Sequence, residues 1–324
     1  MRFRTEINPG KSEFRITHTQ QILSLGSCFA EHIGGLLGKY KFNCQLNPFG
    51  ITYNPAAIAQ SIETLRAQRL YDQSDLFEDK GIWSSLDHHS SFSASDPAKV
   101  VASVNAEIEK GHNQLPNLDL LILTFGTAHV FYHRDKNRIV NNCHKLSTSY
   151  FDRKLLSVDD VFNALADQLS ALKSLSPSLK VILTVSPVRH LRDGLVKSKL
   201  SKATLLVATH QLANHFDFVE YFPAYEMLID DLRDYRFYNA DLVHPTDSAI
   251  AYVWGQFAQT YFDETTMQIN KKVRQIQEAM QHRPFFPESD QHKEFLKSQL
   301  LKTKALKREH PFLDLSEETT YFNS

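Results

Sequence analysis

The sequence predicts an α/β protein in which helices cover both faces of a parallel β-sheet. Short apolar runs rich in β-branched residues alternate with helical patterns over most of the chain. The apolar runs are 22–25, 118–124 and 179–185, with a weaker one at 216–221. Nearly continuous apolar strands are typical of parallel sheets buried on both faces. Their alternation with helices indicates crossover connections between neighbouring parallel strands.

Helical periodicity fills the stretches between and after these runs. In 28–40, for example, Phe29, Ile33, Leu36 and Leu37 form one apolar stripe. The other expected helices are 55–68, 98–110, 158–175, 198–215 and 248–262. Open parallel sheets bind ligands at the carboxyl ends of their strands, beside the point where the strand order reverses. Candidate functional residues are therefore those that directly follow the strands.

A second region begins near residue 264, where the sequence becomes charged and strongly helical. Two prolines within 282–289 interrupt it, which predicts two surface helices in 264–310. These helices pack either on the body of the protein or on another copy of the chain, as a homo-oligomer contact. We expect 311–324 to be poorly ordered. The predicted domains are 1–263, an α/β domain, and 264–324, a helical extension.

Composition restricts the class of partner and the compartment. The 324 residues include 36 Lys and Arg against 37 Asp and Glu, a net charge of −1. Nucleic acids and anionic membranes require a basic surplus, so neither is expected as the main partner. No apolar run approaches the roughly 20 residues of a membrane span, and the N-terminus lacks the apolar core of a signal peptide. Three cysteines are too few for a disulfide framework and indicate a cytoplasmic location.

Ser27 is the first candidate for chemistry. It follows the first predicted strand and opens the first predicted helix, and Gly26 before it permits a tight turn. A helix N-terminus favours negative charge that develops nearby. The alternative is an ordinary N-cap, a position where serine is strongly preferred. The neighbouring Cys28 is a rival nucleophile whose side chain we expect to point into the helix packing.

Asp241 and His244 form the second candidate. A serine nucleophile needs a base to take its proton, and the base needs an acid that orients it. Of the 15 histidines, only His244 has an aspartate three positions earlier. The alternative is that Asp241 or Asp247 caps a helix and His244 lies on the surface.

Other polar positions lie in predicted loops. Gly50 lies between two Asn-Pro steps, Gly126 and Thr127 follow the second strand, His190 follows the third, and Asn142 lies in a polar cluster. Taken singly, each is explained by turn chemistry. No metal or other cofactor is expected, because zinc-type ligand spacings and the glycine-rich phosphate-binding motifs are missing from the sequence.

Ordered motifs across residues 20–260 resemble the GSCFA-domain family. The segment 26–30 reads GSCFA. The further matches are 47–50, 53–55, 126–128, 142–145, 186–190, 221–226, 232–238 and 241–245. This family looks like a branch of the SGNH, or GDSL-like, hydrolases. The resemblance implies a flavodoxin-like three-layer α/β/α fold and an esterase-type activity.

The resemblance also implies a role for particular residues. Ser27 would be the nucleophile, Gly50 would donate its N–H to the oxyanion, and Asp241 and His244 would be the paired acid and base.

The sequence departs from the superfamily pattern at two points. Gly26 precedes the serine where an aspartate is usual. Gly126 and Thr127 fall where the pattern has Gly-x-Asn-Asp, so the asparagine that donates to the oxyanion has no counterpart. Thr127, His129 and Asn142 are the candidate replacements.

The sequence therefore predicts a serine hydrolase that acts on a small-molecule or glycan ester, such as an O-acetyl group. Arg189, His190 and Arg233 could recognise an acidic group on the substrate, or the arginines could form structural ion pairs. The alternative function is a binding module for a carbohydrate or polyol that kept the fold and lost the oxyanion donors.

Overall fold

The computed structural model describes residues 4–323, which form two compact units. The sheet unit contains residues 4–9, Gln21–Gly35 and Cys44–Gln256. The helical unit contains Gly10–Gln20, Leu36–Asn43 and the residues from Phe257 onward. Two segments from the N-terminal part of the chain thus belong to the helical unit. The domain boundary at 263/264 stays a prediction.

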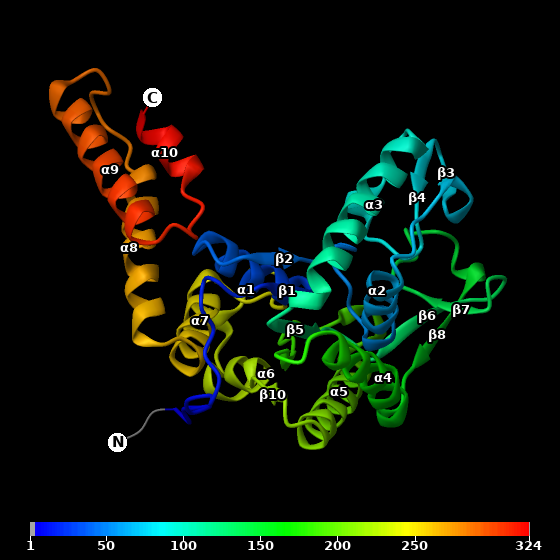
Figure 1. The fold of residues 1–324 in the computed structure, drawn as a ribbon. Helices are drawn as coiled ribbons and strands as arrows, with labels where there is room; N and C mark the ends of the chain where they lie inside the picture. Colours follow the sequence, from blue (N-terminus) through cyan, green and yellow to red (C-terminus); the bar gives the residue numbers. More distant parts are fainter. Residues whose placement is uncertain (1–3, 324) are drawn as a thin grey trace. The chain divides into compact units, whose positions relative to one another are not determined.

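The sheet unit is built on five parallel strands (Figure 1). They are β1 (Ile22–Gly26), β2 (Cys44–Leu46), β5 (Leu120–Phe125), β9 (Lys180–Val185) and β10 (Val219–Tyr221). Their order is β10-β9-β5-β1-β2, and every pairing in the sheet is parallel. This is the flavodoxin-like order, whose switch point lies between β1 and its neighbour β5. The predicted fold class is confirmed.

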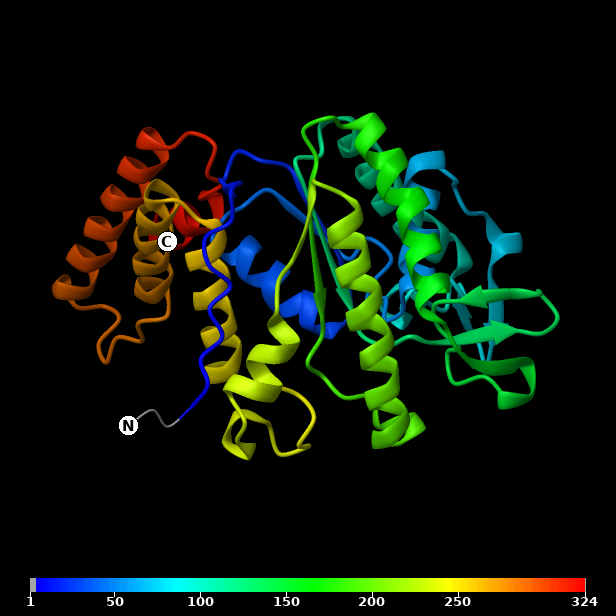
Figure 2. The same cartoon turned by 90° about the horizontal axis from the view of Figure 1, so that it is seen from below.

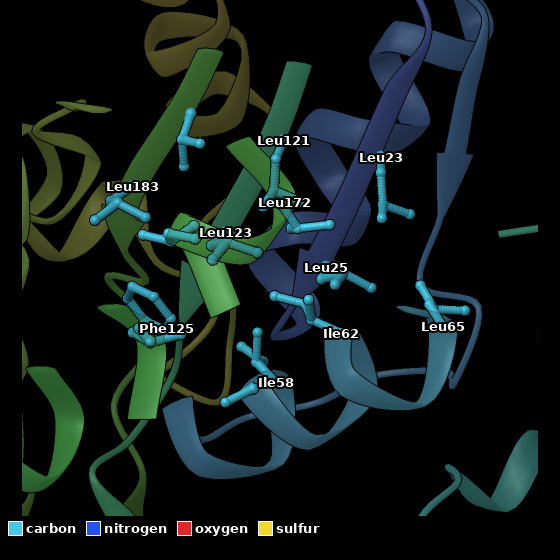
Figure 3. Close-up of a cluster of buried hydrophobic side chains, with 14 of the residues drawn as sticks. Leu23, Leu25, Ile58, Ile62, Leu65, Leu121, Leu123, Phe125, Leu172 and Leu183 are labelled. Carbon is cyan, nitrogen blue, oxygen red and sulfur yellow. The ribbon is translucent and has the colours of Figure 1, made fainter. Parts of the chain in front are cut away.

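Helices cover both faces of the sheet and complete three layers. One face carries α2 (Pro55–Ala67), α3 (Pro97–Gln114), α4 (Val158–Leu175) and α5 (Leu195–His215). Figure 3 shows Ile58 and Ile62 of α2 directed at Leu25 and Leu123 of the strands, all within one buried cluster. The helices α1 (Cys28–Lys39) and α7 (Asp247–Tyr261) lie on the opposite face (Figure 2). The helices predicted between and after the strands are all present.

Several short elements were not predicted. They are the edge strand β2 of the parallel sheet, the hairpin β3 (Phe77–Asp79) and β4 (Ile82–Ser84), the antiparallel sheet β6 (His129–His133), β7 (Arg138–Val140) and β8 (Phe151–Leu155), the short helix α6 (Ala224–Glu226), and a π-helical turn at Met227–Asp231. These strands have three to five residues and mix polar with apolar side chains. Hydrophobic alternation is weak over so few positions, so pairing with a neighbour decides whether the strand forms.

The helical unit contains α8 (Glu264–Met280), α9 (Asp290–Glu309) and α10 (Ser316–Asn323). The prediction that 311–324 is poorly ordered was wrong for 311–323, and residue 324 lies outside the described residues. Leu313, Leu315 and Phe322 are buried in a shared apolar cluster, and Lys41 forms a 2.7 Å ion pair with the buried Glu318. The segment is polar overall, so its few buried apolar residues gave no clear signal in the sequence. Within residues 4–323, no helix has both the length and the apolar character needed to cross a membrane.

Candidate functional site

Ser27 lies at the carboxyl end of β1, beside the switch point. Its backbone N–H donates to the Thr124 carbonyl oxygen at 3.0 Å, and its side chain is 1% exposed. The Ser27 hydroxyl has no hydrogen-bond partner among the described residues. An N-cap serine would accept a bond from an N–H of the first helical turn. The side chain therefore does not cap α1, the alternative that the sequence left open.

Gly26 allows this close turn for a steric reason. Its φ is +149°, and a Cβ on it would lie 2.3 Å from the Thr124 carbonyl oxygen. Its N–H donates to the side-chain oxygen of Asn47 at 2.9 Å. The residue before Ser27 is thus glycine because strand β5 passes too close for a side chain.

Three strand-end segments converge on Gly126, which directly follows β5. A Cβ built on Gly126 would lie 3.1 Å from Ser27 Cβ, 3.0 Å from His190 Nε2 and 3.1 Å from the Tyr53 carbonyl oxygen. Ser27 and His190 therefore both adjoin the unsubstituted side of this glycine. The predicted residues Ser27, Gly126 and His190 form one cluster at the edge of the sheet.

Asp241 and His244 are hydrogen-bonded, as their spacing predicts. Asp241 Oδ2 lies 2.6 Å from His244 Nδ1, and Asp241 Oδ1 accepts the backbone N–H groups of Val243 and His244 at 2.9 and 3.0 Å. The backbone N–H and ring of His244, with the Val243 N–H, lower the pKa of Asp241 to about 2. The pair lies on a loop before α7, with side chains 50% and 45% exposed.

His244 lies near α1, the helix that Ser27 precedes. Burial lowers the pKa of His32 on α1, and His244 acts on the same ring electrostatically, lowering it further. No hydrogen bond joins His244 to Ser27, since the Ser27 hydroxyl is unpartnered. The structure thus joins the acid to the base, and leaves the base and the nucleophile unbonded.

The backbone groups expected to receive an oxyanion donate to carbonyl oxygens instead. The Gly50 N–H donates to Asn47 at 2.7 Å within a turn where Gly50 has φ +72°. The N–H groups of Gly126 and Thr127 both donate to Tyr53, at 2.8 and 3.0 Å. The expectation that Gly50 offers a free N–H is therefore not met in this conformation.

The three candidate replacements for the missing asparagine make contacts elsewhere. Thr127 Oγ1 lies 3.0 Å from Ser201 Oγ, and His129 Nδ1 lies 3.9 Å from Asp193. The Asn142 side chain donates to Ser90 Oγ at 3.3 Å and accepts from the His144 N–H. The hydrogen bonds of Thr127 and Asn142 are thus made to groups other than Ser27.

His190 differs from these candidates. Neither of its ring nitrogens has a hydrogen-bond partner within residues 4–323, and the ring makes an edge contact with Tyr53 at 5.3 Å between centroids. Burial lowers the pKa of His190 to about 3, and the positive charges of Lys202 and Arg153 contribute in the same direction. A neutral imidazole therefore lies beside Ser27 with hydrogen-bonding capacity to spare.

Lys202 on α5 was missed by the sequence analysis. It is 2% exposed, and its ammonium group donates to the carbonyl oxygens of Gly126 at 2.5 Å and Ser186 at 2.6 Å. Burial lowers its pKa to about 7. A sequence signal existed, since Lys202 shares the buried helical stripe of Ser198 and Leu205.

Arg189 and Arg233 were expected either to recognise an acidic group on the substrate or to form structural ion pairs. Arg189 packs over the Tyr238 ring at 5.1 Å, so the loop after β9 contacts the segment that leads to Asp241. Arg233 lines a cavity of about 560 Å³ together with Arg4 and Asp234. Among residues 4–323, no cluster of three or more histidine, cysteine or acidic side chains has metal-binding geometry.

The protein is thus a three-layer α/β/α protein with Ser27 at the switch point of a flavodoxin-like sheet. The chain belongs to the GSCFA family, whose model matches residues 21–257. A second model, described as the C-terminal domain of GSCFA domain proteins, matches residues 273–324. No curated protein matches the chain by sequence. Among solved structures, the crystal structure of a carbohydrate esterase family 3 protein from Talaromyces cellulolyticus is similar with a TM-score of 0.37 and 10% identity, over 78% of this chain and 99% of that one.

Proposed function

We propose that this protein is a serine hydrolase of the SGNH type that cleaves a short acyl ester, such as an O-acetyl group on a carbohydrate. The observation that carries the proposal is the Ser27 hydroxyl, which is buried and unbonded at the switch point beside His190. A buried hydroxyl without a partner is costly to keep. The Ser24 hydroxyl is also buried and unpartnered but lies within strand β1, so it is the place of Ser27 at the carboxyl end of the strand, where ligands bind in such sheets, that favours a reactive role.

The Asp241–His244 pair supplies the remaining groups of a triad. Because Asp241 holds Nδ1 of His244, the Nε2 atom is left to accept the Ser27 proton. The half-exposed loop that carries the pair must close on Ser27 for this transfer. Catalytic hydrogen bonds are often long before substrate binds, so the unbonded arrangement is compatible with the proposal.

The proposed reaction has two steps. Ser27 Oγ attacks the acyl carbonyl while His244 takes its proton, and the tetrahedral intermediate collapses when His244 protonates the departing alcohol. Water then attacks the acyl-serine, His244 takes a proton from that water, and the acid leaves as Ser27 recovers its proton. Asp241 stabilises the imidazolium in both steps.

His190 is the proposed oxyanion donor that replaces the missing asparagine. A neutral imidazole with its proton on Nε2 donates one hydrogen bond and needs no counter-charge. The pKa of about 3 keeps the ring neutral at physiological pH. Electrostatic stabilisation by one such donor is worth about 100- to 1,000-fold in turnover.

The test is a Ser27→Ala variant assayed with p-nitrophenyl acetate. We expect turnover to fall at least several hundred-fold while the folded state persists. A fluorophosphonate probe should label Ser27 in the wild-type protein, with the site located by peptide mass spectrometry. Ser24→Ala is the matched control, because Ser24 is also buried and unbonded but lies within strand β1. Equal turnover in wild type and Ser27→Ala would refute the proposal.

A second candidate function is a binding module for a carbohydrate or polyol without turnover. Two observations favour it: the expected backbone donors are occupied, and Ser27 is only 1% exposed. The same probe discriminates. A folded wild-type protein that neither reacts with the fluorophosphonate nor hydrolyses the ester would support the binding module.

A further inference from the structure

Lys202 is a buried cation without a carboxylate partner. Within residues 4–323, no aspartate or glutamate lies within ion-pair distance of it, and its hydrogen bonds go to the backbone oxygens of Gly126 and Ser186. Charged groups are rarely buried unless an opposite charge compensates them, because the loss of hydration is costly. The loss of hydration at Lys202 therefore indicates a role for its ammonium group other than packing.

Lys173 is a second lysine whose ammonium group holds backbone carbonyl oxygens at one end of β9. Its ammonium also donates to two carbonyl oxygens, those of Pro177 at 2.7 Å and Leu179 at 2.9 Å. These oxygens precede β9, at the end of the strand opposite to Ser186. Lys173 is half-buried and keeps part of its hydration, whereas Lys202 does not. Tethering a strand end thus does not by itself require a buried charge.

Lys202 is linked to Ser27 through one residue, Gly126. It binds the carbonyl of Gly126, the residue whose open side faces both Ser27 and His190. The charged or titratable groups that act on it are Cys28 of α1 and Arg189 of the loop after β9, and Lys202 in turn acts on His190. No acidic side chain is among them. Glu31 acts on Cys28 and Asp193 acts on His190, so the nearest acidic groups face the neighbours of Lys202 rather than Lys202 itself.

We propose that Lys202 is a positioning residue for the reaction at Ser27: its ammonium group fixes the turns after β5 and β9 and places a positive charge where it favours the oxyanion. This inference rests on the proposed hydrolase function. Lys202 acts through Gly126 and His190 and does not touch the substrate.

The role implies a distinctive pH dependence. Because burial lowers the pKa of Lys202 to about 7, the positive charge disappears as the pH rises above neutrality. Burial also raises the pKa of the Cys28 thiol, so that group stays neutral over the same range. The base His244 must also lose its proton as the pH rises, but this affects wild type and a Lys202 variant alike. The ratio of wild-type turnover to that of a variant without the charge should therefore fall between about pH 6 and pH 9, the interval around the pKa of Lys202.

The test compares full-length Lys202→Met, Lys202→Arg and Lys173→Met with wild type, using p-nitrophenyl acetate at pH 6 and pH 9 and thermal unfolding. For Lys202→Met we expect kcat at pH 6 to fall about 10- to 100-fold, with KM changed less than about threefold. At pH 9 the difference in kcat between wild type and Lys202→Met should be smaller, because Lys202 of the wild type has lost its charge. Lys173→Met should lower the unfolding temperature and leave kcat unchanged.

Lys202→Arg keeps a charge at every pH, so its kcat relative to wild type should rise between pH 6 and pH 9, which keeps the test valid if Lys202→Met does not fold. A Lys202→Met kcat equal to wild type, or reduced by the same factor at pH 6 and pH 9, would overturn the inference. A Lys202→Arg kcat that keeps the same ratio to wild type at both pH values would do the same. Failure of the hydrolase proposal looks different: the wild-type protein itself would neither turn over ester nor label at Ser27.

Discussion

At the residue scale, the acid–base pair is the part of the site that depends least on the rest of the fold. Asp241 and His244 are three residues apart, and the carboxylate also binds the backbone N–H groups of the same loop. A short-range interaction of this kind can be recognised from spacing alone. The contact between this pair and Ser27 is long-range and needs the whole sheet.

Replacing Asp241 with asparagine tests the role of the carboxylate. Asp241→Asn can still accept the Val243 N–H but cannot stabilise a charged imidazole, so turnover should fall by up to about 10⁴-fold. Because Asp241 is half-exposed, the unfolding temperature should change little. The measurement is kcat for p-nitrophenyl acetate alongside thermal unfolding.

Asp247→Asn is the matched control, since Asp247 lies in the first turn of α7 and near His32 as well. If Asp247→Asn lost as much turnover as Asp241→Asn, the assignment of Asp241 as the orienting acid would fail.

At the element scale, the turn from β1 into α1 depends on the close approach of β5. Gly26 has no room for a Cβ because the Thr124 carbonyl oxygen and side chain lie within 3 Å of that position. The strand pairing that brings Thr124 there also receives the Ser27 N–H. The serine is therefore held by the two central strands of the sheet, and its placement depends on their register.

A Gly26→Ala variant should show this dependence. The added methyl group must displace backbone of β5, so we expect a loss of about 1–3 kcal/mol in the free energy of unfolding, together with lower turnover. Urea denaturation measures the first and ester hydrolysis the second.

Gly35→Ala in α1 is the control, because nothing lies within 4 Å of its Cβ position and the residue is exposed. Alanine in a helix should raise the free energy of unfolding by about 0.5–1 kcal/mol relative to glycine. A Gly26→Ala protein as stable as wild type would contradict the steric account of this turn.

At the scale of the whole molecule, buried neutral histidines make stability depend on acidity. Burial lowers the pKa of His88 to about 4, and that of His190 to about 3. Their usual value is about 6.5, so in between the unfolded chain binds protons that the folded chain does not. By linkage, stability is then lost as the pH falls from about 6.5.

We therefore expect the unfolding temperature to decrease between pH 7 and pH 5. His88 stacks on Phe49 and has an unpartnered Nε2, so His88→Phe removes the titration while keeping an aromatic ring in place. This variant should show a shallower decrease than wild type, whatever its stability at pH 7. His282→Gln, at an exposed position, should leave the slope unchanged, and the account fails if His88→Phe leaves it unchanged too.

The sequence alone determined the parts of the protein that depend on local patterns. Apolar runs and helical periodicity predicted the long strands and the helices around them, and the spacing of Asp241 and His244 predicted their contact. The segment 26–30 carries the signature that resembles the GSCFA family. The short strands and the packing of 311–323 were not predicted, because their stability comes from partners distant in the chain.

Only the tertiary structure decided which groups surround Ser27. Gly50 and Thr127 were expected to face an oxyanion, but backbone N–H groups donate to the nearest well-placed carbonyl, and the loops supply one for each. His190 and Lys202 both approach Gly126, the neighbour of Ser27, from elements that no spacing rule connects. The groups around Ser27 are set by burial and by long-range strand pairing. Both depend on how the strands align with one another and not on the sequence of any one strand.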